Sequence, residues 1–200
     1  MSLQFDEQLS RLQKPNRNEM TDEEYKVFDD NVTMMMDNWG FINNLFKVLP
    51  LNASEYIGFL NFKDSLYNPE KTFLSAADKE MIGLVVSSTN GCTYCLTTHG
   101  DNLRGFTGDP AWVDKITYNY RAADMTEKQR ALCDYAYFVT AYPREIGPEQ
   151  IEGLRKAGFN DHEILEAAFV AGFFNYTNRW VSAISPEPNE GHYFHNREKK

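Results

Sequence analysis

The strongest constraint in this sequence is a repeated helix-start signal. At several places a Ser, Thr or Asn stands three residues before an acidic or Gln side chain, and apolar residues follow at three- and four-residue steps. Among these pairs are Ser75 with Asp78, Thr126 with Gln129, and Asn160 with Glu163. In such a pair each side chain accepts a hydrogen bond from a backbone N–H at the start of a helix. No alternating strand pattern of comparable strength occurs, so the sequence predicts an all-α fold.

The other expected helices are bounded by glycine and proline. Gly40 supplies a left-handed cap, and Pro50 and Asn68-Pro69 end two further segments. The expected helices cover residues 22–39, 42–48, 53–67, 75–90, 131–142, 149–157 and 164–174, and one more begins with the cysteines after Asn90-Gly91. The helix over 164–174 is apolar nearly all round, which predicts burial at the centre of the fold or by another subunit.

The chain divides into one helical domain and two polar ends. A length of 200 residues with 42% hydrophobic side chains provides one sizeable core, which we assign to a single-domain helical bundle over residues 21–184. Residues 1–20 form a polar arm, and residues 185–200 form a tail in which His192 and His195 are expected at the surface. Four polar residues after the apolar helix are expected to bond its last carbonyls or a neighbouring subunit: Asn175, Tyr176, Asn178 and Arg179.

Charge and composition exclude several classes of function. The formal net charge is −9 and the basic residues are scattered, so nucleic acid is not an expected partner. We expect no membrane span and no secretory signal, and hence a cytoplasmic protein. No glycine-rich phosphate loop or haem-attachment motif is present, so no organic cofactor is expected.

A cysteine pair with one histidine carries the candidate chemistry. Cys92, Cys95 and His99 stand at i, i+3 and i+7, so on a helix they project from one face. A free thiol is mostly protonated at neutral pH, but unpaired N–H groups in the first helical turn and a nearby histidine both favour the thiolate. The pattern therefore indicates thiol redox chemistry at Cys92 and Cys95.

Glu80 is the expected second base. It lies within an apolar stretch of the preceding helix, and a turn at Asn90-Gly91 would bring its carboxyl near the cysteine face, where burial would make it a better base. A zinc site is the alternative for the pair, but its second half would have to come from Cys133, His162, His192 and His195, which lack the spacing. We therefore expect no metal, and we expect Cys133 to be a buried core residue outside the site.

These residues resemble a known family, the alkylhydroperoxidase D-like or carboxymuconolactone decarboxylase-like proteins, in the peroxidase-related branch. The resemblance rests on Glu80, eleven intervening residues, Cys92-Thr-Tyr-Cys95, three more and His99, and it extends over roughly residues 25–185. It implies an all-α homo-oligomer that reduces organic hydroperoxides or hydrogen peroxide with its dithiol and is itself reduced by a dithiol protein.

The resemblance also implies roles for the four residues. Cys95 corresponds to the thiolate that attacks peroxide, Cys92 to the resolving thiol, and His99 and Glu80 to a proton relay. Tyr94 departs from the pattern, because the best-known relatives have a histidine directly before the second cysteine, and a phenol is a poorer proton carrier. Decarboxylase relatives work without the cysteine pair, so that activity is not expected. The alternative function is a non-enzymatic redox sensor or interaction protein switched by the Cys92–Cys95 disulfide.

Overall fold

The computed structural model describes residues 9–199, and the part of the chain so described contains helices and no strand, as the sequence predicts. Its α-helices are α1 (Asp22–Trp39), α2 (Asn44–Val48), α3 (Ala53–Leu66), α4 (Ala76–Asn90), α5 (Thr93–Thr107), α6 (Pro110–Asn119), α7 (Glu127–Ala141), α8 (Pro148–Lys156), α9 (Asp161–Ile184) and α10 (Gly191–Phe194). Short 3-10 turns lie at Arg17–Glu19, Leu49–Leu51 and Tyr120–Ala122. Within residues 9–199, none of these helices has the length and hydropathy of a membrane span.

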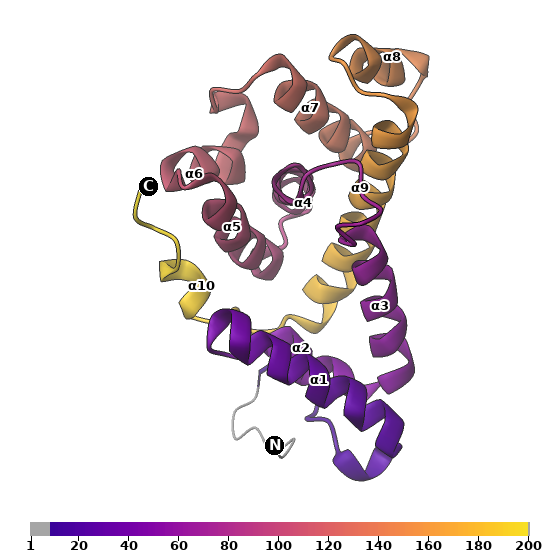
Figure 1. Cartoon of the computed structure of the whole chain (residues 1–200), viewed down its shortest axis with the longest axis vertical. Coiled ribbons are helices and arrows are strands. Elements are labelled where there is room, and N and C mark those ends of the chain that lie inside the picture. Colours follow the sequence, from indigo (N-terminus) through magenta and orange to yellow (C-terminus); the bar gives the residue numbers. More distant parts are fainter. Residues whose placement is uncertain (1–8, 200) are drawn as a thin grey trace.

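Helix α4 forms the centre of the molecule. It is seen end-on in Figure 1 with α5, α6, α7 and α9 around it, and it packs against all four. Every residue from Lys79 to Ser87 is buried, and the Ser75–Asp78 capping box begins the helix as expected. The central helix is therefore α4 rather than the segment over 164–174, which exposes half or more of Leu165 and Phe169.

Helix α9 continues beyond the apolar segment to Ile184, so the polar residues expected after the helix lie inside it. The Asn178 amide donates to the Ser87 hydroxyl at 3.1 Å, and the Asn90 amide donates to the Asn175 and Asn178 side-chain oxygens at 3.1 and 3.0 Å. Asn175 and Asn178 thus tie α9 to the end of α4. A structural role was expected for them, but their main partner is another helix of the same chain.

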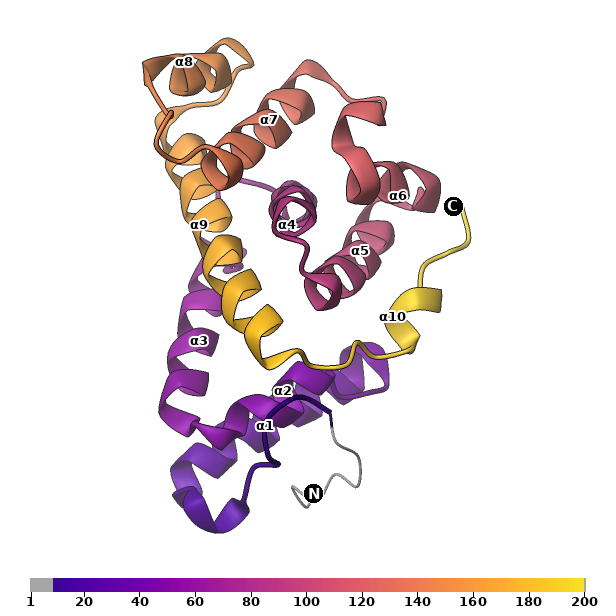
Figure 2. The ribbon, with the colours of Figure 1, turned by 180° about the vertical axis from the view of Figure 1, so that it is seen from behind.

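The segment after α9 folds back on the domain. It runs from the end of α9 past the first turn of α5 to α10, which packs on α5 (Figure 2). The prediction of a surface position for His192 is wrong: its side chain is fully buried, and its Nδ1 lies 2.7 Å from an Asp101 carboxylate oxygen. Arg104 donates to the backbone oxygens of His192 and His195, so α5 anchors the tail, whereas the His195 side chain is 42% exposed.

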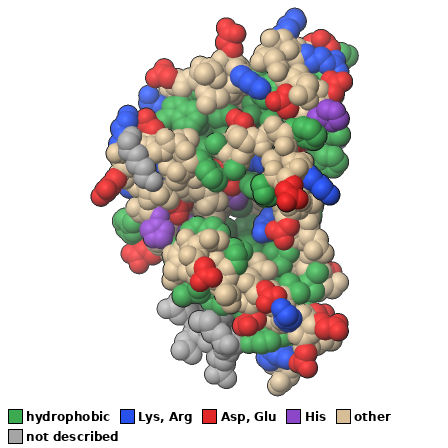
Figure 3. All heavy atoms as spheres, viewed as in Figure 1, with side chains coloured by type: hydrophobic (Ala, Val, Ile, Leu, Met, Phe, Trp, Pro, Cys, Tyr) green, Lys and Arg blue, Asp and Glu red, His purple; other side chains and the backbone are tan. Residues whose placement is uncertain are grey.

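The described part of the N-terminal arm contacts the same region. The Arg11 N–H donates to the Ile184 carbonyl at 2.9 Å, and the Glu187 N–H donates to the Leu9 carbonyl at 2.8 Å. Residues 1–8 of the predicted arm lie outside the described residues. Charged side chains of both signs are interspersed over the face in Figure 3, where a hollow near the middle is bordered by hydrophobic side chains.

Candidate active site

The turn between α4 and α5 presents the cysteine pair. Gly91 ends α4 in the left-handed region, with φ of 69°, and glycine adopts this conformation without a steric penalty. Cys92 is the residue that caps α5, and Cys95 lies in the first turn of that helix. The two are joined by a disulfide across a Cα–Cα distance of 5.4 Å, so their side chains lie close enough to bridge.

Glu80 and His99 form a close pair between the two helices. One Glu80 oxygen, Oε2, lies 2.6 Å from His99 Nδ1, and the carboxyl group is buried, since the residue is 3% exposed. Glu80 therefore lies buried at the helix face that carries the cysteines and His99, where it was expected. An Nδ1–H bond to the carboxylate leaves Nε2 as the ring nitrogen able to exchange a proton with a ligand.

The second Glu80 oxygen is held by two further donors that sequence reasoning missed. Oε1 accepts hydrogen bonds from the Tyr67 hydroxyl at 3.2 Å and from the Asn102 amide at 3.4 Å. Burial, together with the neighbouring Glu80 carboxylate, holds the pKa of Tyr67 well above its usual range, so this phenol remains a donor. Asn102 follows His99 by three residues and could have been found from that helical spacing, whereas Tyr67 carries no local signal.

The His99 ring packs against Phe174 of α9. It meets the Phe174 ring edge to face, with centroids 4.7 Å apart. Gly83 makes this approach possible, because a Cβ there would come within 2.4 Å of Phe174. The packing of α4 against α9 therefore helps to fix the position of His99.

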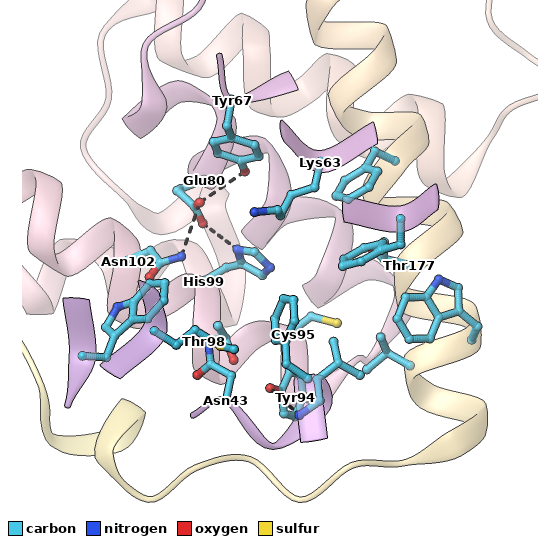
Figure 4. Close-up of a pocket in the computed structure, with 18 of the residues that line it drawn as sticks. Asn43, Lys63, Tyr67, Glu80, Tyr94, Cys95, Thr98, His99, Asn102 and Thr177 are labelled. Atoms are coloured by element: carbon cyan, nitrogen blue, oxygen red, sulfur yellow. Dashed lines mark hydrogen bonds and ion pairs between the residues drawn. The ribbon is translucent and has the colours of Figure 1, made fainter. Parts of the chain in front are cut away.

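Cys95, His99 and Glu80 line one cavity of about 280 Å³, which we call the Cys95 cavity (Figure 4). The three residues face a wall of aromatic and apolar side chains from α1, α3 and α9, among them Met34, Trp39, Phe59, Phe173 and Trp180. Lys63 is the basic residue in the lining, and its ammonium group also contacts Asp64 at 2.7 Å. The cavity thus combines a mainly apolar volume with a compact polar end at Glu80, His99 and Asn102.

Tyr94 fills the space between the cysteines and α2. Its side chain is buried, and its hydroxyl accepts a hydrogen bond from the Leu45 N–H at 3.1 Å. Burial raises the pKa of Tyr94 above its ordinary value, so the phenol stays protonated at neutral pH. This residue therefore has a structural partner and carries no readily exchanged proton.

The remaining candidate metal ligands lie apart from the cysteine pair. Cys133 is buried in α7, and burial raises the pKa of its thiol well above the usual range, as expected for a core residue. His162 stacks on Phe73, with centroids 4.8 Å apart, and His192 is engaged by Asp101. His162 and His192 thus have partners other than the cysteine pair.

Comparisons with known proteins agree with this arrangement. Residues 58–136 match the carboxymuconolactone decarboxylase family. An uncharacterized peroxidase-related protein from Silicibacter sp. TM1040 is 34% identical over 96% of this chain and 97% of its own, with a TM-score of 0.86. A second structure, described as an alkylhydroperoxidase AhpD core and uncharacterized peroxidase-related protein from Ralstonia eutropha JMP134, is 29% identical over 97% and 100% of the two chains, with a TM-score of 0.88. No match was found among curated proteins.

Proposed function

The chain belongs to the alkylhydroperoxidase D-like, carboxymuconolactone decarboxylase-like family, in its peroxidase-related branch, and we propose that it reduces hydroperoxides with the Cys92–Cys95 dithiol. The observation that carries the proposal is the shared cavity of Cys95 with His99, whose ring is bonded to the buried Glu80. We assign the chemistry to the helical unit of residues 21–184 in a cytoplasmic protein.

The first step is attack of the Cys95 thiolate on the terminal oxygen of the hydroperoxide. His99 takes the thiol proton, supported by the Glu80 carboxylate, and the first turn of α5 favours the resulting anion. The S–O bond forms as the O–O bond breaks, and His99 returns the proton to the departing alkoxide. The products are an alcohol and a sulfenic acid on Cys95.

Cys92 completes the oxidative half of the cycle. Its sulfur attacks the sulfenic sulfur, the S–S bond forms, and the oxygen leaves as water. A dithiol reductant then returns two electrons and two protons, which restores both thiols. The disulfide between these residues supports the geometry that this step needs.

The lining of the cavity supports an organic substrate over hydrogen peroxide. Phe59, Phe173 and Trp180 would bury an apolar substituent, and the hydroperoxide group would lie at the Cys95 and His99 end. The small cluster of polar groups there fixes the orientation of the substrate.

We propose a homo-oligomer built on the exposed apolar face of α9. Leu165, Phe169 and Tyr176 follow one helical stripe and are each more than half exposed, and Phe62 of α3 borders them. An apolar stripe of this kind on a helix surface is typical of a subunit contact.

A turnover assay tests the proposed function against a redox sensor. The protein is mixed with cumene hydroperoxide and excess dithiothreitol, and alcohol production is counted per protein chain. An enzyme produces many equivalents, and Cys95→Ser abolishes turnover because no sulfenic acid forms without the attacking thiolate. A wild-type protein that forms the disulfide once and then stops would support the sensor and contradict the enzyme.

A further inference from the structure

The two cysteines of the disulfide line different cavities. Cys95 lines the Cys95 cavity, whereas Cys92 lines a second cavity of about 350 Å³, which we call the Cys92 cavity. The second cavity lies between the first turn of α5, the end of α9 and the chain that follows it. Its lining residues are Gly91, Cys92, Thr93, Tyr94, Val181, Ser182, Ser185, Pro186, Glu187, Pro188 and Tyr193.

Tyr94 and Val181 form the wall between the two cavities, because both residues line both. Val181 is 2% exposed, and the Tyr94 hydroxyl is fixed by the Leu45 N–H at 3.1 Å. The wall is therefore made of packed, hydrogen-bonded side chains. A molecule in one cavity therefore meets one cysteine of the pair, and the wall separates it from the other cysteine.

We propose that the reductant enters through the Cys92 cavity and attacks the Cys92 sulfur, while the hydroperoxide enters through the Cys95 cavity. The proposal rests on the dithiol chemistry of the proposed function. Thiol–disulfide exchange needs a thiolate that approaches one sulfur in line with the bond to the other. Cys92 lines the Cys92 cavity, so a thiolate in this cavity would attack the Cys92 sulfur and expel Cys95 as the leaving group.

Reduction of the Cys92–Cys95 disulfide consumes two thiols of the reductant. The first thiolate forms a bond to the Cys92 sulfur as the Cys92–Cys95 bond breaks, and Cys95 leaves as a thiolate. A second thiolate attacks the reductant sulfur of this mixed disulfide, which releases the oxidised reductant and the Cys92 thiolate. Two protons from the reductant thiols end on the protein. The first turn of α5 favours the Cys95 thiolate that leaves in this step.

The tail limits what can reach Cys92, which is only 1% exposed. Pro186 to Pro188 and Tyr193 cover the cavity, and the tail is held on α5 by the buried pair of His192 and Asp101. Glu187 is one of the lining residues, and its negative charge near the cavity disfavours an anionic ligand. The reductant is therefore a small thiol, or a thiol on a narrow uncharged arm, rather than a cysteine on a folded protein surface.

Mapping of the mixed disulfide on the wild-type protein tests the site of attack. The disulfide is formed chemically with diamide, so the test does not depend on hydroperoxide activity. The oxidised protein is mixed briefly with 2-mercaptoethanol, the remaining thiols are blocked with iodoacetamide in an acid-to-neutral quench, and the adduct is located by fragmentation mass spectrometry. We expect the adduct on Cys92 and the alkyl group on Cys95. An adduct mainly on Cys95 overturns the proposal.

A matched pair of variants tests the two routes. Ser182→Trp fills the Cys92 cavity from an exposed position on α9, and Met34→Trp narrows the Cys95 cavity. We expect Ser182→Trp to slow reduction by 2-mercaptoethanol about tenfold or more, because the attacking sulfur is kept from its in-line position. Oxidation by cumene hydroperoxide should stay within about twofold, and Met34→Trp should give the opposite pattern.

The outcomes separate this proposal from the proposed function. If both half-reactions slow equally in either folded variant, or if Met34→Trp alone slows reduction, the two-route proposal is overturned. If wild-type protein fails to react with hydroperoxide while the 2-mercaptoethanol adduct still maps to Cys92, the proposed function fails and the assignment of the reductant cavity stands.

Discussion

Replacing Glu80 with Gln keeps the shape of the side chain and removes its charge at the centre of the proposed relay. The Glu80 carboxylate lies 2.6 Å from His99 Nδ1, and water barely reaches it, because the residue is 3% exposed. Glu80→Gln turns a charge-assisted hydrogen bond into a neutral one, a loss of about 1–2 kcal/mol, or about 5- to 30-fold in rate if Glu80 only orients His99. General-base assistance is worth about 10²–10⁴-fold, and this is the loss that we expect.

The assay follows disulfide formation in the reduced protein after mixing with excess cumene hydroperoxide at neutral pH. Raising the pH should restore part of the rate in Glu80→Gln, because hydroxide then removes the thiol proton. Glu149→Gln removes the same charge from an exposed position and serves as the matched control, with an unchanged rate. A Glu80→Gln rate within about fivefold of wild type, in a protein with an unchanged helical circular dichroism spectrum, would remove Glu80 from the relay and leave His99 acting as the base without it.

Three further predictions concern other parts of the molecule. Because burial raises the pKa of Cys133, iodoacetamide should label Cys92 and Cys95 in the reduced native protein and leave Cys133 unlabelled; equal labelling would contradict its core position. Glu166→Gln should destabilise the fold by about 3–5 kcal/mol in urea unfolding, since Lys79 is 1% exposed and its ammonium lies 2.9 Å from the Glu166 carboxylate. Partial burial tends to raise the pKa of Glu166, but hydrogen bonds from Thr72, Lys79 and two backbone N–H groups outweigh burial and hold this pKa below its usual range. The stabilisation by the charged Glu166 carboxylate is therefore present above about pH 4.5 and is lost as the pH falls through the lowered pKa. Light scattering should find an oligomer for the wild type and smaller species for Phe169→Glu, and a wild-type monomer at micromolar concentration would count against the α9 interface.

Local signals in the sequence predicted much of the helix pattern. The capping boxes at Ser75, Thr126 and Asn160 begin α4, α7 and α9 as expected, because a capping box involves only four consecutive residues. Helix α6 was missed, although Asp109 caps it by accepting from the Trp112 N–H at 3.1 Å and Pro110 occupies its first turn. Its start signal was present, but it lacks the second acidic or amide partner that marked the starts of α4, α7 and α9.

The parts that the sequence did not predict depend on contacts between distant segments. The burial of His192 comes from Asp101, 91 residues earlier in the chain, and no local pattern indicates that pairing. The wall of the Cys95 cavity also combines residues that are distant in the sequence, because Phe59 comes from α3 and Phe173 and Trp180 come from α9. The pairing of Glu80 with His99 could be predicted because a single glycine turn joins their helices, whereas the second cavity at Cys92 depends on where the tail returns.

Trapping the sulfenic acid tests the central claim, that Cys95 is the residue that attacks the hydroperoxide. Cys92→Ser removes the resolving thiol, so the oxidised Cys95 persists long enough to react with dimedone. One equivalent of cumene hydroperoxide should then give one dimedone adduct, located on Cys95 by mass spectrometry, while Cys95→Ser should give none. A dimedone adduct on Cys92 in Cys95→Ser, formed as fast as the adduct on Cys95, or no adduct in Cys92→Ser, would contradict the account.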